Sequence, residues 1–355
     1  MAEASKLKAW ISAARLRTLP LSISGILVGS AYAYWGLYQG KLAKSTLENL
    51  QKEKVYNQLS NNLRNEISEV LDLYLSDFNF LIPILALITT LGFQVLSNFA
   101  NDYGDGVKGT DNEDRIGPMR ALQSGIISPV EMKRGMVITA ILTLISAILL
   151  IYVSLGIDRL LISLFFLALG IAAIWAAIRY TVGDNAYGYR GLGDVFVFIF
   201  FGPVSVMGIF YLITKVVNWQ MIFPSITIGL LSVAVLNLNN MRDIESDKKA
   251  GKNTIVVKMG LAKAKMLHIA FVSIAFISTI SFFFVHYSDE LWNRKIESPS
   301  IIIFLPLLAF IPLFVHLLKV KRTKSPALLD PELKKVALST FFFAILCVVS
   351  VWILA

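Results

Sequence analysis

Nine long apolar stretches dominate this chain and limit what it can fold into. A helix needs about 20 mainly apolar residues to cross roughly 30 Å of lipid hydrocarbon. The stretches that meet this requirement are 19–38, 79–100, 131–153, 159–180, 193–213, 220–240, 264–286, 299–318 and 335–354. Strands of a membrane β-barrel instead alternate in polarity over about ten residues. We therefore expect an all-α integral membrane protein with nine transmembrane helices.

The composition excludes a water-soluble domain. Apolar residues make up 56% of the 355 residues and charged residues only 16%, whereas a globular protein carries about 25% charged residues. The single cysteine, Cys347, excludes a disulfide framework or a cysteine metal site. The three histidines, His268, His286 and His316, lie far apart in or beside apolar stretches, so we expect them to be structural.

Lysine and arginine are distributed unequally between the two sides of the membrane. With the N-terminus placed in the cytoplasm, 24 of the 33 Lys and Arg residues fall on the cytoplasmic side, which is the asymmetry typical of membrane proteins. This distribution explains the net charge of +9 without nucleic-acid binding. The basic N-terminus precedes a long apolar stretch that has no small-residue cleavage site, so we expect an uncleaved anchor.

Residues 39–78, between the first two apolar stretches, are polar and rich in Asn, Glu, Lys and Gln. Val55, Leu59, Leu63 and Ile67 recur there at a spacing of four, which is the pattern of an amphipathic helix. We expect this insert to form an extramembrane helix that lies on the outer surface or caps the bundle. A helix that binds a partner is the alternative interpretation.

Acidic residues gather after the second and the sixth apolar stretch, which both end at the cytoplasmic side. Asp102 and Asp105 are three residues apart, and Asp243 and Asp247 are four apart, so each pair shares one face of a helix. Such carboxylates suit Mg²⁺, which is commonly bound by carboxylates and substrate phosphates together. Solvated loop carboxylates are the alternative. Two clusters of matching layout at span ends favour a metal site.

Basic residues near both clusters can complete a clamp for a diphosphate group. They are Lys108, Arg115, Arg120, Arg242 and Lys258. Their side chains can hold phosphate oxygens, while a bound metal neutralises the charge that develops on a leaving diphosphate. Asparagines beside each cluster can orient the carboxylates or ligate the metal themselves. The pattern predicts a site that binds magnesium and diphosphate together.

These motifs make the chain similar to the UbiA superfamily of intramembrane prenyltransferases, and within it to the branch that acts on 1,4-dihydroxy-2-naphthoate. Residues 98–134 resemble the first Asp-rich motif and the segment after it, and residues 236–260 resemble the second motif of that branch. Residues 179–194 are similar to its link between the fourth and fifth spans, and residues 15–19 to its first segment. The resemblance covers nearly the whole chain except 39–78.

The resemblance implies a nine-helix bundle with a central cavity, formed by one catalytic domain over residues 1–355. The residues that it implies for magnesium binding and catalysis are Asn101, Asp102, Asp105, Asp243 and Asp247. The residues that it implies for substrate binding are Asn98, Asn101, Lys108, Arg120, Asn240, Arg242 and Lys258. Tyr180 is similar to an aromatic residue that faces the developing allylic cation, which a π face can stabilise; a core tyrosine is the alternative.

The chain departs from the superfamily pattern at two positions. The last acid of the first motif would fall at Gly109, and Asp111 follows instead as a further candidate metal ligand. Leu16 follows Arg15 where the family usually has proline, which leaves the roles of Arg15 and Arg17 open.

The implied enzyme transfers a polyprenyl group from a polyprenyl diphosphate to 1,4-dihydroxy-2-naphthoate, with Mg²⁺ as cofactor and with loss of CO₂, and gives demethylmenaquinone. It is expected in the bacterial cytoplasmic (inner) membrane, with the active-site loops on the cytoplasmic side and no obligate protein partner. Another aromatic acceptor, such as 4-hydroxybenzoate or homogentisate, remains open. So do a non-catalytic scaffold and a cation-coupled transporter, although transporters usually hold such charges near the membrane midplane.

Overall fold

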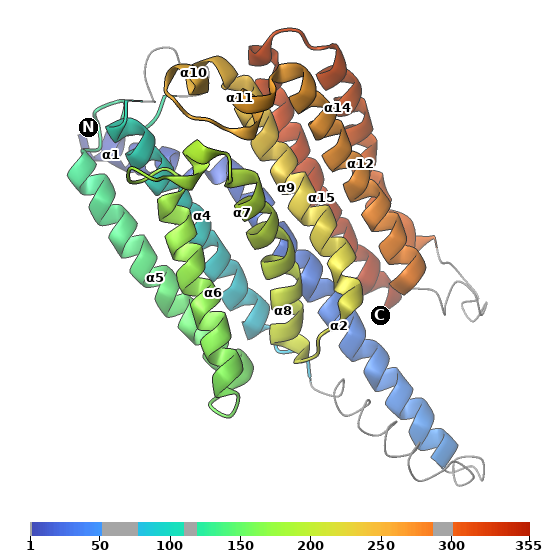
Figure 1. Cartoon of the computed structure of the whole chain (residues 1–355). Helices are drawn as coiled ribbons and strands as arrows, with labels where there is room; N and C mark the ends of the chain where they lie inside the picture. The colour runs from blue at the N-terminus through green and yellow to red at the C-terminus, as the bar shows by residue number, and fades with distance from the viewer. Residues whose placement is uncertain (1, 52–76, 110–118, 287–300) are drawn as a thin grey trace.

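The computed structural model describes residues 2–51, 77–109, 119–286 and 301–355 as helices joined by turns (Figure 1). The longer helices are α1 (Ala2–Ala14), α2 (Leu19–Gln51), α4 (Leu81–Val107), α5 (Pro129–Leu155), α6 (Leu160–Arg179), α8 (Ser205–Thr214), α9 (Ile222–Arg242), α12 (Leu261–His286), α14 (Phe310–Arg322) and α15 (Asp330–Leu354). The short ones are η1 (Leu16–Thr18), η3 (Tyr187–Arg190), α7 (Gly193–Ile199), η4 (Phe200–Val204), η5 (Trp219–Met221), α10 (Ile244–Lys249), α11 (Ile255–Met259), η6 (Ile302–Ala309) and η7 (Pro326–Leu329).

Within these ranges, eight helical segments are long and apolar enough to cross a membrane. A ninth span results if α1 and α2, which meet at a bend of 46°, are counted together. The prediction of an all-α membrane protein is therefore confirmed, and the apolar stretches that predicted the spans all coincide with helices.

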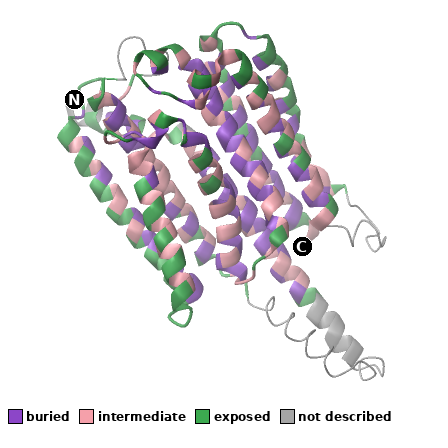
Figure 2. Ribbon diagram, in the orientation of Figure 1, coloured by how far each residue is buried: buried purple, intermediate pink, exposed green. Residues whose placement is uncertain are grey.

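The bundle exposes apolar side chains and buries polar ones. On α5, Ile138, Ile141 and Ile145 are exposed, whereas Ser146 faces inward and shares a 2.8 Å hydrogen bond with the buried Thr89 of α4. Exposed residues lie along the outer helices in Figure 2. A water-soluble bundle would show the reverse arrangement. A surface of this kind on long helices matches lipid as the solvent.

The C-terminal ends of α4 and α9 lie at the same end of the bundle as α1, α10 and α11 (Figure 1). We call this the motif end, because both acidic motifs are there. Helix α5 also begins there: Ser128 and Glu131 form a capping box around the first turn, which Pro129 opens. Lys6 of α1 pairs with Glu131 at 2.5 Å, which ties the N-terminal helix to this end.

Helix α2 is longer than the first apolar stretch predicts. It continues beyond residue 38 to Gln51, because residues 41–51 contain neither glycine nor proline and consist mainly of good helix formers. The extension leads away from the bundle (Figure 1). The amphipathic pattern from Val55 to Ile67 lies outside the described residues.

The fifth span is interrupted between α7 and α8 by a π-helical segment, η4. Pro203 lies in this segment and has no N–H group to continue an α-helical ladder. The preceding Gly202 packs directly on α9, since a Cβ atom there would lie only 2.5 Å from the backbone oxygen of Ser225. The interruption brings α7, η4 and α9 together around the interior of the bundle.

Candidate active site

A cavity of about 580 Å³ lies inside the bundle, with a wall formed mainly by α2, α4, α5, α6, α7, η4, α8, α9 and α15. Its lining on α4 includes both Ala86 and Asp105, which lie about 28 Å apart along a straight helix. Charged residues such as Asp105 and Lys252 line it at the motif end, and Leu150 and Ile151 line it farther down. A cavity of this shape suits a ligand with a charged head and a long apolar tail.

The two carboxylates of the first acidic motif have different surroundings. Asp102 is buried, and its Oδ2 accepts a hydrogen bond from the backbone N–H of Ala121 at 3.1 Å, while its Oδ1 accepts one from the next amide at 3.4 Å. Asp105 lines the cavity. Its Oδ1 accepts a hydrogen bond from the Tyr189 hydroxyl at 2.9 Å, and its Oδ2 lies 3.7 Å from Nη2 of Arg120. Asp102 thus anchors the segment after α4, and Asp105 presents its charge to the cavity.

The second acidic motif is held by Arg242, the last residue of α9. Its Nε and Nη2 donate to the two carboxylate oxygens of Asp243 at 2.7 and 2.6 Å, and its Nη1 donates to Oδ1 of Asp330 at 2.6 Å. Nη2 also donates to Oδ1 of Asn239 at 2.9 Å. This bidentate contact fixes the position of Asp243. Arg242, predicted to bind substrate, lines the cavity, and its guanidinium joins the motif to α15.

Lys252 joins the two motifs. Its Nζ lies 3.5 Å from Oδ1 of Asp247, both side chains are buried, and Lys252 lines the cavity. Burial alone would lower the pKa of Lys252, but the carboxylates of Asp105 and Asp247 outweigh it and raise that pKa. Burial raises the pKa of Asp247 to about 6; Lys252 opposes this rise, and the charges of Asp243 and Asp105 add to it. The negative charges of carboxylates from both motifs therefore act on one ammonium group.

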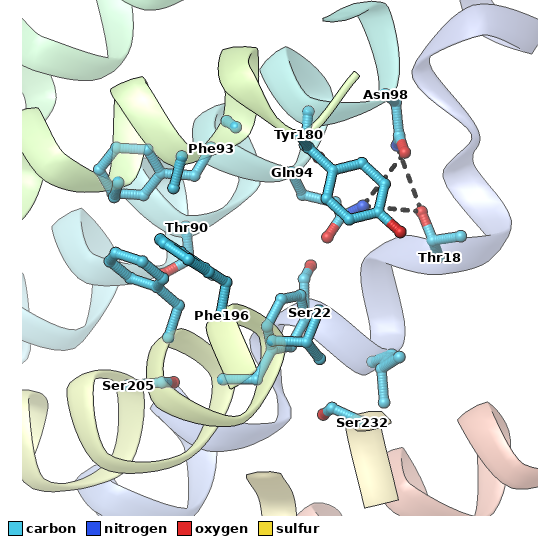
Figure 3. A pocket seen from close by; sticks show the side chains of 18 of the residues that line it. Thr18, Ser22, Thr90, Phe93, Gln94, Asn98, Tyr180, Phe196, Ser205 and Ser232 are labelled. Carbon is cyan, nitrogen blue, oxygen red and sulfur yellow. Dashed lines mark hydrogen bonds between the residues drawn. The ribbon is translucent and has the colours of Figure 1, made fainter. Parts of the chain in front are cut away.

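Tyr180 lines the same cavity as Asp105 and Lys252, and Figure 3 shows its ring in the cavity wall. Burial raises the pKa of its hydroxyl to about 12. Its ring fills a slot between two glycines, since a Cβ atom at Gly188 or Gly193 would lie 3.0 or 2.9 Å from its Cε2. The ring of Tyr187 packs edge-on against it, with the centroids 5.4 Å apart. The aromatic residue that was predicted to face an allylic cation is thus placed in the cavity wall by close packing.

Asn98 and Asn101 line the cavity from α4. Nδ2 of Asn98 donates to the backbone oxygen of Ala14 at 2.8 Å, and Oδ1 of Asn101 accepts a hydrogen bond from Thr181 Oγ1 at 3.3 Å. Both amides therefore connect α4 to neighbouring segments as well as facing the cavity.

The oxygen atoms at the motif end fit Mg²⁺ only if a substrate shares the coordination. Among the described residues, no three His, Cys, Asp or Glu side chains are arranged to hold a metal ion. Oδ2 of Asp247 and Oδ1 of Asn240 are, however, buried and have no hydrogen-bond partner within the described part of the chain. Buried oxygens of this kind need a cation or donor. Mg²⁺ keeps several waters and takes phosphate oxygens beside one or two carboxylates, so the donor set fits.

Other predicted site residues either do not belong to the described lining of the cavity or lie beyond the described ranges. Nζ of Lys108 donates to the backbone oxygen of Gly183 at 2.9 Å, and burial lowers the pKa of Lys108. Nζ of Lys258 donates to the backbone oxygen of Arg190 at 2.8 Å. Both lysines thus fasten the segment between α6 and α7. The structure does not describe Asp111, so that candidate ligand stays a prediction.

Sequence reasoning missed Lys252, Asp330 and Gln94. Lys252 is one of several basic residues between two spans, and it turns inward because Gly251 reverses the chain with a φ of +69°. Asp330 reaches Arg242 across 88 positions of sequence, for which a single sequence carries no signal. Gln94 lies one helical turn before Asn98, on the same face of α4. That spacing was the available signal, and it was not used.

Comparison with known proteins identifies relatives along nearly the whole chain. Residues 74–293 match the family model of the UbiA prenyltransferase family. The chain is 38% identical to the 1,4-dihydroxy-2-naphthoate octaprenyltransferase of Haemophilus influenzae, over 96% of this chain and 94% of the relative. It is 40% identical to the enzyme of the same name from Escherichia coli, over 81% of this chain and 80% of the relative. Both alignments are far too long to reflect a shared local motif.

Two solved structures share the fold. One is a UbiA homolog from Archaeoglobus fulgidus bound to DMAPP and Mg²⁺, with a TM-score of 0.52, 17% sequence identity, and coverage of 94% of this chain and 98% of the other. The second is a digeranylgeranylglyceryl phosphate synthase, with a TM-score of 0.51, 17% identity, and coverage of 97% and 99%. The helical bundle described above is thus the fold of known membrane prenyltransferases.

Proposed function

This chain belongs to the UbiA prenyltransferase family, and we propose that it transfers a polyprenyl group from a polyprenyl diphosphate to 1,4-dihydroxy-2-naphthoate with loss of CO₂, giving the hydroquinone form of demethylmenaquinone. The observation that carries the reaction type is the cavity itself, in which two acidic motifs meet around Lys252 above a long apolar channel. The choice of acceptor is supported by the relatives from Haemophilus influenzae and Escherichia coli, whose names give the same substrate.

We propose that the diphosphate group of the donor binds at the motif end. Lys252 and Arg120 line the cavity there and can contact phosphate oxygens. Asp105, Asp247 and Asn240 would hold Mg²⁺ together with the diphosphate, and the metal would stabilise the negative charge on the leaving group. The prenyl tail would extend downward between Leu150, Ile151 and the aromatic wall formed by α6, α7 and η4.

The reaction breaks the allylic C–O bond, and its electron pair leaves with the diphosphate. The ring of Tyr180 lies where it can stabilise the allylic cation through its π face, and the apolar walls keep water from capturing that cation. The naphthoate ring carbon that bears the carboxylate then forms the new C–C bond. Loss of CO₂ returns its electron pair to the ring and restores the aromatic hydroquinone.

We also propose in which membrane the protein lies and which side of that membrane its motif end faces. The excess of Lys and Arg on the side of the acidic motifs favours a cytoplasmic motif end. Relatives from bacteria support a place in the cytoplasmic membrane. A prenyl donor and an apolar product both suit an enzyme whose substrates partition into lipid.

An acceptor assay tests the proposed function directly. Purified full-length protein in lipid nanodiscs is incubated with Mg²⁺, a polyprenyl diphosphate and either 1,4-dihydroxy-2-naphthoate or 4-hydroxybenzoate. We expect prenylated product, diphosphate and CO₂ in equal amounts with the naphthoate, and no product after chelation of the metal. Prenylation of 4-hydroxybenzoate alone would reassign the acceptor, and absence of diphosphate release with every acceptor would reject the enzyme assignment.

A further inference from the structure

A hydrogen-bonded polar cluster lies in the wall of the cavity that Tyr180 also lines (Figure 3), one to two helical turns before the first acidic motif on α4. It consists of Thr18 from η1 and of Gln94 and Asn98 from α4. Nε2 of Gln94 donates to Oδ1 of Asn98 at 3.2 Å and to Oγ1 of Thr18 at 3.4 Å. Nδ2 of Asn98 donates to Oγ1 of Thr18 at 3.3 Å. The proposed reaction, as described above, leaves this cluster without a role.

The hydrogen-bond pattern fixes which end of each amide is the oxygen. A backbone carbonyl can only accept, so the Asn98 atom 2.8 Å from the oxygen of Ala14 must be its NH₂ group. Asn98 therefore presents Oδ1 to Gln94. The Thr18 hydroxyl donates to the backbone oxygen of Arg15 at 2.9 Å, so its oxygen can only accept from Gln94. Asn98 and Thr18 thus both act as hydrogen-bond acceptors toward Gln94.

The amide nitrogen of Gln94 therefore donates its hydrogen bonds to Asn98 and Thr18. Its amide oxygen is left as an acceptor at the wall of the cavity that Tyr180 also lines (Figure 3). An amide oxygen can bind only a ligand group that donates a hydrogen bond. The prenyl diphosphate carries no such donor on its apolar tail, whereas a dihydroxynaphthoate carries two ring hydroxyls. The wall is thus complementary to the acceptor substrate.

We propose that Gln94 is a specificity-determining residue that accepts a hydrogen bond from one ring hydroxyl of the aromatic acceptor, and that Thr18 and Asn98 hold its amide in this orientation. This inference rests on the proposed function. As the ring carbon attacks the allylic cation, positive charge spreads onto the ring and makes the hydroxyl proton more acidic. The hydrogen bond to Gln94 becomes stronger in the transition state, so it promotes the reaction as well as binding.

The test compares wild type with Gln94→Met, which keeps the length of the side chain and removes the amide. Two competitive inhibitors, 1-hydroxy-2-naphthoate and 4-hydroxy-2-naphthoate, each keep one of the two hydroxyls. We expect Gln94→Met to weaken one of them about tenfold, the typical effect of leaving one hydrogen-bonding partner unpaired. The other inhibitor and the KM of the prenyl donor should stay within about twofold, since neither uses the contact.

Gln220→Met is the matched control. Gln220 lies in η5, before the end of α9 that is opposite to the motif end, and forms a hydrogen bond with His286 there. Its replacement should leave both inhibition constants unchanged. Equal weakening of the two inhibitors in Gln94→Met would indicate a purely structural role and overturn the inference, as would no weakening of either. Wild-type protein that does not prenylate the dihydroxynaphthoate at all would instead refute the proposed function, and the inference with it.

Discussion

The ammonium group of Lys252 lies 3.5 Å from Oδ1 of Asp247, and both side chains are almost completely buried. A buried ion pair is stable only when further partners offset the loss of hydration, and the carboxylate of Asp105, from the other motif, also favours the charged form of Lys252. Lys252 is therefore paired with the second motif and lies within the electrostatic field of the first. It is also placed to meet the negative charge of a diphosphate when one enters.

Replacing Lys252 by methionine should raise the KM for the prenyl diphosphate about tenfold or more, because a hydrogen bond to a charged group contributes roughly 1.5–3 kcal/mol. The KM for the naphthoate should change little. Steady-state kinetics with each substrate varied separately measure both values. Lys248→Met is the control, since Lys248 is exposed on the neighbouring helix α10. An unchanged donor KM in Lys252→Met would contradict a role in diphosphate binding.

Asp105→Ala and Asp247→Ala should each lower kcat at least about a hundredfold, because each removes an oxygen proposed to hold the metal and diphosphate during bond cleavage. Added Mg²⁺ should restore part of the activity if the remaining ligands still bind it weakly. The measurement is product formation across a Mg²⁺ titration. Glu245→Ala, on the exposed side of α10, should behave like wild type. Turnover near the wild-type level in either aspartate variant would show that the replaced carboxylate does not hold the metal and the diphosphate.

Much of this architecture is predictable from one sequence, because lipid imposes a simple pattern. The apolar stretches predict where spans lie, and the spacing of Asp102 and Asp105 predicts that two acids share a helix face at the motif end. The separate roles of these two acids are not predictable. They depend on Ala121 and Tyr189, which approach from other segments of the chain.

Contacts between distant segments explain the remaining differences. Arg242 is bonded to Asp330 of the last helix, and the orientation of Gln94 depends on a hydroxyl in η1. Neither contact leaves a periodic trace in the sequence. The length of α2 was underestimated for a different reason. Hydrophobicity determines where a span ends, whereas helix propensity determines where the helix ends, and the two boundaries differ by 13 residues, between 38 and Gln51.

Gly193→Ala should lower kcat by displacing Tyr180. A Cβ atom at position 193 would lie 2.9 Å from Cε2 of Tyr180 and 3.3 Å from its hydroxyl, which forces the ring to shift. A double-mutant cycle with Tyr180→Ala provides the measurement. If Gly193→Ala acts through the ring, it should cost much less activity when Tyr180 is already alanine. Equal losses in both backgrounds would show that the glycine acts by another route.

Gly208→Phe should shorten the donor that the enzyme accepts. Gly208 lines the cavity on α8, and a Cβ atom there would lie 3.7 Å from the ring of Phe166, so a phenyl group must extend into the cavity. We expect turnover of octaprenyl diphosphate to fall about tenfold or more while geranyl diphosphate is retained, since overpacking costs roughly 1–3 kcal/mol. Chromatography of products formed from mixed donors measures the shift. Unchanged use of the octaprenyl donor would place its tail elsewhere.

The contact between Arg242 and Asp330 makes the second motif depend on a helix that is distant in the sequence. Asp330 begins α15 and supplies the carboxylate that braces the guanidinium beside Asp243. A shift of α15 relative to α9 would therefore move Arg242 and, through its bidentate contact, Asp243. Packing changes along α15 can in this way alter the position of a carboxylate that belongs to another span.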